Sequence, residues 1–216
     1  MTKLTRVVSL VGSPKAKNST SAVLGDSLTT HFEAHGVDVK SYQSHRLLRR
    51  SAEMVSFLDD LDRCELFVVS TPTYVDSLPY VLTAVFEAIA AHRVESSAKQ
   101  GQRILCIANC GFPEPEHNDI ALDICRVFAD AAGFDWCGGI RISAGGVING
   151  MPLEARGGLT RNYRDAFAQA AHALIDGEDV PETAVEILSK PLIPRKMYLV
   201  AGSVGWIARA RQEGIG

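Results

Sequence analysis

Hydroxyl and amide side chains crowd one short segment near the amino terminus, the run GSPKAKNST at residues 12–20. It follows the apolar run 7–11 and leads directly into a segment with helical spacing of apolar residues. The first amides of a helix have no partner within that helix, and they carry the positive end of its dipole. Such amides bind anions, and hydroxyl donors beside them favour phosphate. We therefore expect a phosphate-binding loop at residues 12–20.

The glycine content of this loop narrows the kind of phosphate group it could hold. A Walker loop needs a second glycine followed by Lys and Ser or Thr, and the dinucleotide fingerprint needs three glycines in the pattern GxGxxG. Only Gly12 is present, which counts against both. The run 66–70 ends without an acidic phospho-acceptor, and the chain has no GxSxG nucleophile elbow, so receiver domains and common α/β hydrolases are disfavoured. A helix cap without a ligand stays open as the alternative.

Two further loops carry residues suited to a planar ligand. In TPTYVDSLP, residues 71–79, Pro72 and Pro79 stiffen the backbone while Tyr74 offers a ring and a hydroxyl. In NCGFPEPEH, residues 109–117, a glycine permits close approach of the backbone beside Phe112. A rigid loop with an exposed aromatic side chain suits a heteroaromatic ring.

The elements that must position these loops can be read from the pattern of apolar residues. Continuous apolar runs predict buried strands, and 3.6-residue spacing predicts helices between them. The predicted strands are 7–11, 37–42, 66–70, 104–108 and 134–143, and the predicted helices are 20–35, 54–61, 79–89, 119–132 and 160–176. Asn118 is expected to cap the fourth helix. Five alternations indicate a doubly wound α/β fold with a parallel sheet. Ligands of such sheets bind at the carboxyl ends of the strands.

Composition excludes several classes of function. The chain has 216 residues, of which 46% are apolar and 22% charged, with a formal net charge of −3. The balance of 22 Lys and Arg against 25 Asp and Glu argues against a dedicated nucleic-acid binder. Five cysteines without a CxxC pair indicate neither disulfides nor a metal site, and they favour the reducing cytoplasm. No apolar run approaches the roughly 18 residues of a membrane-spanning helix, so no integral membrane segment is expected.

Two of these loops resemble those of the flavodoxin-like, FMN-binding NAD(P)H-dependent oxidoreductases. The run GSPKAKNST is similar to the GSPRxxxxT phosphate loop of that family, and TPTYVDSLP is similar to its TPxYxxxxP flavin loop. The resemblance spans Arg6 to Ala132. It implies a five-stranded sheet of order 2-1-3-4-5 with helices on both faces. It also implies bound FMN, NAD(P)H as co-substrate, and a small electron acceptor such as a flavin or quinone.

The resemblance assigns the site residues as well. The FMN phosphate would be held by Ser13, Lys15, Asn18, Ser19 and Thr20. The flavin ring would lie along Pro72, Thr73, Tyr74, Val75 and Asp76, with Asn109, Cys110, Gly111 and Phe112 on its other edge. The cofactor carries the redox chemistry in such proteins, so no catalytic side chain is named. Thr83 replaces a basic residue that often follows the flavin loop. Only Cys64 precedes the third strand, so no iron–sulfur cluster is expected.

The carboxyl-terminal part of the chain follows a different pattern. We expect an FMN-binding domain over residues 1–177 and a helical extension over residues 178–216. The extension's basic and apolar tail would pack on its own subunit or a partner, with a membrane surface as the alternative. The resemblance implies a homodimer or homotetramer, and the tail around Trp206 and the loop at Gly145 are candidate contact surfaces. A flavodoxin-type electron carrier and a flavin-free binding module on the same fold remain alternatives.

Overall fold

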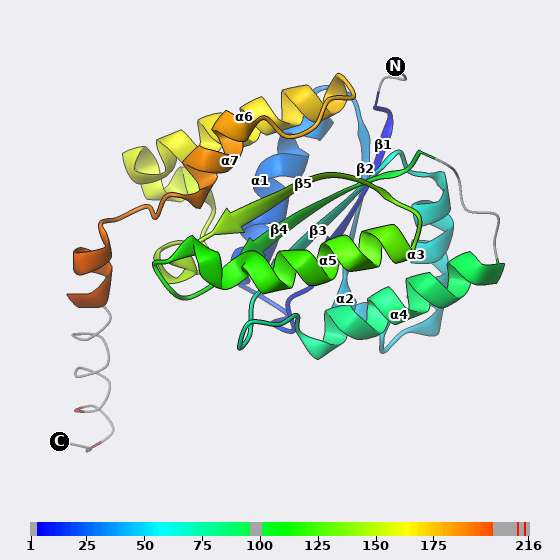
Figure 1. Cartoon of the computed structure of the whole chain (residues 1–216), viewed down its shortest axis with the longest axis horizontal. Helices are drawn as coiled ribbons and strands as arrows, with labels where there is room; N and C mark the ends of the chain where they lie inside the picture. Colours follow the sequence, from blue (N-terminus) through cyan, green and yellow to red (C-terminus); the bar gives the residue numbers. More distant parts are fainter. Residues whose placement is uncertain (1–3, 96–100, 201–210, 212–213, 215–216) are drawn as a thin grey trace.

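A computed structural model describes residues 4–95, 101–200, 211 and 214. Its centre is one parallel sheet of order β2-β1-β3-β4-β5 (Figure 1). The strands are β1 Arg6–Val11, β2 Asp38–Gln43, β3 Leu66–Pro72, β4 Arg103–Asn109 and β5 Asp135–Ile142. The predicted fold class and strand order are therefore confirmed. Because the strands are parallel, their carboxyl ends lie at one edge, on the left of Figure 1.

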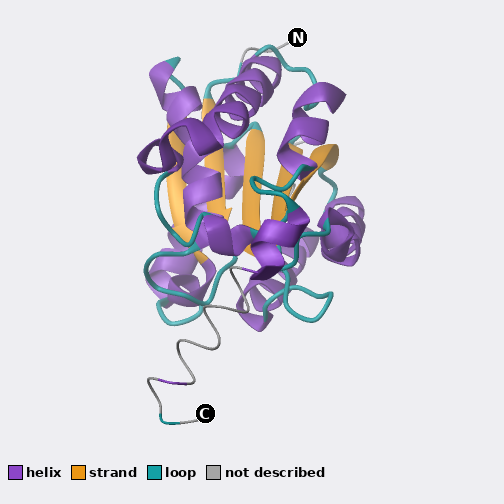
Figure 2. Cartoon of the chain, turned by 90° about the vertical axis from the view of Figure 1, so that its left-hand side faces the viewer, coloured by secondary structure: helices purple, strands orange, loops and turns teal. Residues whose placement is uncertain are grey.

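Helices cover both faces of the sheet (Figures 1 and 2). They are α1 Thr20–Ala34, α2 Ser44–Leu47, α3 Ser51–Arg63, α4 Tyr80–Glu95, α5 Asp119–Ala131, α6 Arg161–Ile175 and α7 Glu182–Ser189. Helices α1, α6 and α7 lie on one face, and α3, α4 and α5 lie on the other. Each strand and helix predicted from the pattern is present. The one-turn helix α2 and the 3₁₀ turns η1 Pro115–Asn118, η2 Gly145–Val147 and η3 Leu153–Thr160 were not predicted, because they are too short or irregular for apolar periodicity.

The continuous apolar runs are explained by two core layers. Successive side chains of a strand point to opposite faces of the sheet. In β3, Leu66 and Val68 belong to the layer under α1, α6 and α7, whereas Phe67 and Val69 belong to the layer under α3, α4 and α5. Both faces of the strand are therefore buried, and every position along it must be apolar or small. This double burial makes the sheet a rigid base for the loops at its carboxyl edge.

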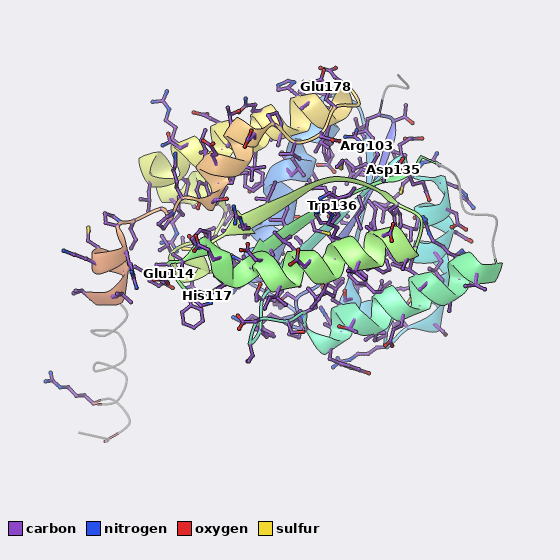
Figure 3. All side chains as sticks on the ribbon, in the orientation of Figure 1. Arg103, Glu114, His117, Asp135, Trp136 and Glu178 are labelled. Carbon is purple, nitrogen blue, oxygen red and sulfur yellow. The ribbon has the colours of Figure 1, made fainter. Side chains whose placement is uncertain are left out.

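The first part of the extension belongs to the same body as the sheet. Ala184 and Leu188 of α7 are fully buried in the core layer of α1 and α6. The Tyr163 hydroxyl of α6 donates to the Lys190 carbonyl at 2.6 Å. At the far end of β4, Arg103 donates to the Glu178 carbonyl, and these two residues lie together in Figure 3. The division at residue 177 stays a prediction, and Trp206 lies outside the described residues.

Among the described residues, no helix is long and apolar enough to cross a bilayer.

Candidate functional site

A pocket of about 180 Å³ lies at the carboxyl edge of the sheet, where the three predicted loops meet. Of the predicted site residues it is lined by Ser13, Lys15, Ser19, Thr20, Pro72, Thr73, Tyr74, Asn109, Cys110 and Gly111. Asn18, Val75, Asp76 and Phe112 are not among its lining residues. The pocket lies beside β1. The chain passes from β1 to β2 on one side of this strand and then crosses to β3 on its other side, so the strand order reverses at β1. This is the switch point at which doubly wound sheets bind ligands.

The segment 12–20 forms a compact turn with unpaired amides at its end. Ser19 is the N-cap of α1, and its Oγ accepts from the Ala22 amide at 3.4 Å. Among the described residues, the amides of Thr20 and Ser21 have no hydrogen-bond partner, and both residues line the pocket. The Ser19 cap therefore satisfies the Ala22 amide but leaves the amides of Thr20 and Ser21 as unsatisfied donors at the pocket wall.

The polarity of this wall suits an anion. The hydroxyls of Ser13 and Ser19 come from buried residues, only 2% and 4% exposed. Lys15 adds a positive charge, and within the part of the chain that the structure describes no Asp or Glu lines the pocket. Hydroxyl donors, free helix amides and a cation with no opposing carboxylate are the donor set that a phosphate group needs. The residues present therefore fit the phosphate of FMN.

The second loop is a strained hairpin. Tyr74 and Ser77 exchange two backbone hydrogen bonds of 2.9 and 3.1 Å. The two residues between them, Val75 and Asp76, have positive φ angles of 49° and 57°, as a type I′ turn requires. A β-branched residue is rare in this region, and such strain costs about 1–3 kcal/mol and marks functional loops. The turn places Tyr74 in the pocket wall and leaves Val75 at the tip, 98% exposed.

Two buried amide side chains join the loops to one another. Asn109 donates from Nδ2 to the Ser21 hydroxyl and to the Thr71 carbonyl, both at 2.8 Å. The Asn118 Oδ1 accepts from the Thr73 hydroxyl at 2.8 Å, and its Nδ2 donates to the Ile142 carbonyl at 3.2 Å. Asn118 does occupy the predicted N-cap position of α5, but its side chain makes no cap hydrogen bond. It connects the ends of β3 and β5 instead.

We expect Asn118→Ala to lower the free energy of unfolding by about 1–3 kcal/mol, because it removes two hydrogen bonds, one from the Thr73 hydroxyl and one to the Ile142 carbonyl, which keeps only the Cys110 amide. Urea denaturation at neutral pH measures the change. The matched control is Asn162→Ala, since Asn162 is exposed on α6 and its loss should cost less than about 0.5 kcal/mol. Equal midpoints for the two variants would contradict the bridging role of Asn118.

A fourth wall, which the sequence did not assign to the ligand, comes from the turn after β5. Gly145, Gly146 and Asn149 line the pocket. The Gly145 amide donates to the Cys110 carbonyl at 2.9 Å, and its carbonyl accepts from the Thr20 hydroxyl at 3.3 Å. The glycine-rich run 145–150 was predicted as a loop over the sheet end, and its glycines were the available signal. Ser21 was also missed, although its place in the first helical turn could have suggested it.

Two of the predicted residues outside the pocket lining, Asp76 and Phe112, both lie near His117. The His117 ring centroid lies 4.5 Å from that of Phe112, and His117 Nδ1 lies 3.8 Å from Asp76 Oδ1. His117 projects at the carboxyl edge in Figure 3, close to Glu114. Asp76 and Phe112 therefore come together through His117, outside the pocket lining. Asn18 is exposed in the phosphate loop with a positive φ of 53°.

All five cysteines are buried. Burial raises the pKa of the Cys110 thiol at the pocket, and it raises the pKa of Cys137 to about 12 from an ordinary value of 9.0. These thiols keep their protons at neutral pH, so they are poor nucleophiles. The pocket therefore contains a thiol that acts as a small apolar group.

We expect iodoacetamide at pH 8 to modify the five thiols slowly in the folded protein and rapidly in urea, because burial blocks access to all five and raises the pKa of Cys110 and Cys137. The raised pKa values also have a consequence for stability. The unfolded chain releases its thiol protons at lower pH than the folded chain, so the free energy of unfolding falls as the pH rises above about 9. Mass spectrometry and urea midpoints at neutral and alkaline pH measure both effects. Rapid labelling of the folded chain would contradict the burial of the thiols.

Several solved structures are similar to this chain in fold. An NADH:FMN oxidoreductase in its apo form is 18% identical with a TM-score of 0.58, over 89% of this chain and 98% of the other. An FMN-dependent NADH-azoreductase from Bacillus anthracis, in complex with FMN, is 14% identical with a TM-score of 0.57, over 80% and 100%. The general stress protein 14 from Treponema denticola, also with FMN, is 13% identical with a TM-score of 0.55, over 80% and 98%.

No family model matches the chain, and no curated protein matches it. At these identities the solved structures establish the fold alone. The strand order and the helices on both faces agree with this likeness in fold. The chain therefore has the flavodoxin-like fold shared by these FMN-dependent oxidoreductases and reductases.

Proposed function

We propose that this chain is an FMN-dependent oxidoreductase that takes hydride from NADH or NADPH and passes electrons to a small acceptor, such as a flavin or quinone. The observation that carries the proposal is the convergence of three loops on one pocket. A phosphate-type donor set from residues 13–21 faces a stiff aromatic loop from residues 72–74 and the backbone of residues 109–111. Phosphate donors beside a wall suited to a planar ring are the two requirements of a mononucleotide with a heteroaromatic head.

Each group of residues has its own part in the proposal. The free amides of Thr20 and Ser21, the nearby hydroxyls and Lys15 bind the phosphate and orient the ligand. The segments Pro72–Tyr74 and Asn109–Gly111 hold the ring at the strand ends, with Cys110 as a small apolar contact. When bound, FMN supplies the redox chemistry, accepting hydride at its N5 atom, and the protein positions and tunes it. The structurally similar proteins include an NADH:FMN oxidoreductase and an FMN-dependent NADH-azoreductase, which supports this assignment.

The proposal extends to the assembly and location of the chain. Large apolar side chains are exposed around the pocket, among them Val75 at 98%, Phe112 at 58% and Met197 at 61%. Exposed apolar clusters of this kind mark interaction surfaces. A homodimer or homotetramer that covers them would complete the acceptor site with residues of a second copy. Five cysteines, an odd number without a CxxC pair, are in keeping with the reducing cytoplasm. Light scattering during gel filtration tests the assembly, and a monomer at working concentrations would contradict it.

The absorption spectrum of the purified, FMN-supplemented protein tests the function. We expect a yellow protein that releases FMN on denaturation and whose flavin band bleaches within seconds when NADH or NADPH is added without oxygen. Bleaching only by a chemical reductant would favour a flavodoxin-type carrier. A colourless protein that binds no added FMN would overturn the proposal in favour of a flavin-free module. A heat-denatured sample with equal FMN controls for free flavin.

A further inference from the structure

We infer that Tyr198, in the carboxyl-terminal extension, is a positioning residue that holds two walls of the pocket together and shapes the rim through which an acceptor enters. The acceptor part of this inference rests on the proposed function. Tyr198 lies outside the segments that carry the predicted cofactor contacts, and about 50 residues beyond the last of the lining residues in sequence.

The contacts of the Tyr198 hydroxyl reach both walls. It donates a hydrogen bond of 2.6 Å to the Gly111 carbonyl in the third loop. On the other side, a β-carbon added to Gly146 would lie 3.0 Å from the Tyr198 hydroxyl oxygen, so the turn after β5 is packed closely against it. Gly111 and Gly146 both line the pocket. The phenol therefore occupies the space between two wall segments that come from β4 and β5.

A second contact attaches the same segment to the same loop. Arg195 Nη2 lies 2.7 Å from Glu114 Oε1, and Glu114 is seen in Figure 3 at the edge nearest the carboxyl-terminal segment. Of residues 194–200, Tyr198 alone is not exposed. The neighbouring Met197 and Leu199 are 61% and 51% exposed, so they contribute little packing. The segment is therefore held by polar contacts to the third loop rather than by an apolar core.

The hydrogen bond to Gly111 also determines the direction of a backbone amide. The carbonyl of Gly111 and the N–H of Phe112 belong to one planar trans peptide, in which the two groups point in opposite directions. Glycine tolerates rotation of this peptide more readily than other residues. Burial, and then the Cys110 thiol nearby, raise the pKa of Tyr198, so its hydroxyl stays a donor at neutral pH. Tyr198 thus keeps the Phe112 N–H turned away from itself.

The experiment compares Tyr198→Phe, which keeps the ring and removes the donor, with Lys196→Ala, which changes an exposed residue of the same segment. Hydrogen exchange of the full-length protein without FMN reports on residues 110–117 and 144–150. Loss of one neutral hydrogen bond predicts about threefold to tenfold faster exchange there in Tyr198→Phe and no change in Lys196→Ala. With FMN and NADH present, the KM for 1,4-benzoquinone should change at least threefold, while the Kd for FMN should change less, because the phosphate donors of residues 13–21 are untouched.

Each other outcome has a defined meaning. Unchanged exchange in Tyr198→Phe, or faster exchange throughout β1 and β3 as well, would overturn the inference, because the hydroxyl would then be dispensable or merely stabilise the whole fold. Faster local exchange with an unaltered KM would overturn the role at the acceptor rim. If the wild-type protein binds no FMN, the proposed function fails, but the exchange measurement still decides whether Tyr198 holds the two walls together.

Discussion

The Gly150→Ala variant is expected to lose about 2–4 kcal/mol of its free energy of unfolding, together with most of its affinity for FMN. Gly150 has a φ of +69°, a conformation that costs an alanine about 1–2 kcal/mol. A β-carbon there would also lie 2.2 Å from the Asn18 carbonyl oxygen, a backbone atom that cannot move alone. The turn after β5 and the phosphate loop must therefore separate, which displaces Thr20 from the Gly145 carbonyl that it contacts at 3.3 Å.

Gly157→Ala is the matched control, because it separates conformational strain from the clash. Gly157 has a φ of +59°, but a β-carbon there meets nothing within 4 Å. It should lose only the strain energy, about 1–3 kcal/mol for an alanine with a positive φ and a ψ of −133°, and keep its FMN affinity. Urea denaturation and FMN fluorescence titration measure both quantities. If Gly150→Ala and Gly157→Ala cost the same and bind FMN equally well, the two loops do not depend on each other.

The sheet could be predicted because burial on both faces imposes a strong pattern. The run 66–70 serves two core layers at once, so it contains no charged residue, and the same holds for 104–108. Residues 12–20 and 71–79 could be assigned to one site for a topological reason. Parallel strands end at the same edge, so loops that follow them must meet once the strand order is known.

The parts of the site that were missed depend on contacts between distant residues. Asn118 was read as a helix cap, a local role, but it bonds across the sheet end to Thr73 and Ile142. Tyr198 reaches Gly111 over 87 positions of sequence. A lone Asn or Tyr has no periodicity or motif that marks such a partner. Val75 shows the same limit for backbone conformation, since its residue type disfavours the positive φ that the hairpin imposes.

The double variant Ser19→Ala, Thr20→Ala is expected to weaken FMN binding by about 3–6 kcal/mol, or on the order of 10²- to 10⁴-fold. Each hydroxyl bonded to a charged phosphate contributes about 1.5–3 kcal/mol, and the two residues adjoin the free amides of α1. The Thr20 hydroxyl gives up only a long 3.3 Å bond to do so. Ser19 also caps α1, so the variant should lose about 0.5–2 kcal/mol of stability as well.

Two further variants separate the binding effect from the loss of stability. Thr20→Ser keeps the hydroxyl and should bind FMN within about threefold of wild type, the allowance for a side chain that loses one methyl group. Thr30→Ala removes an exposed hydroxyl from the same helix, one that bonds to the Asp26 carbonyl at 2.8 Å, and it should leave FMN binding unchanged. Fluorescence titration at a temperature where each variant is folded gives the affinities. A folded double variant with wild-type affinity would mean that the hydroxyls of Ser19 and Thr20 do not bind the phosphate, because the variant removes both of them and leaves the amides of Thr20 and Ser21 in place.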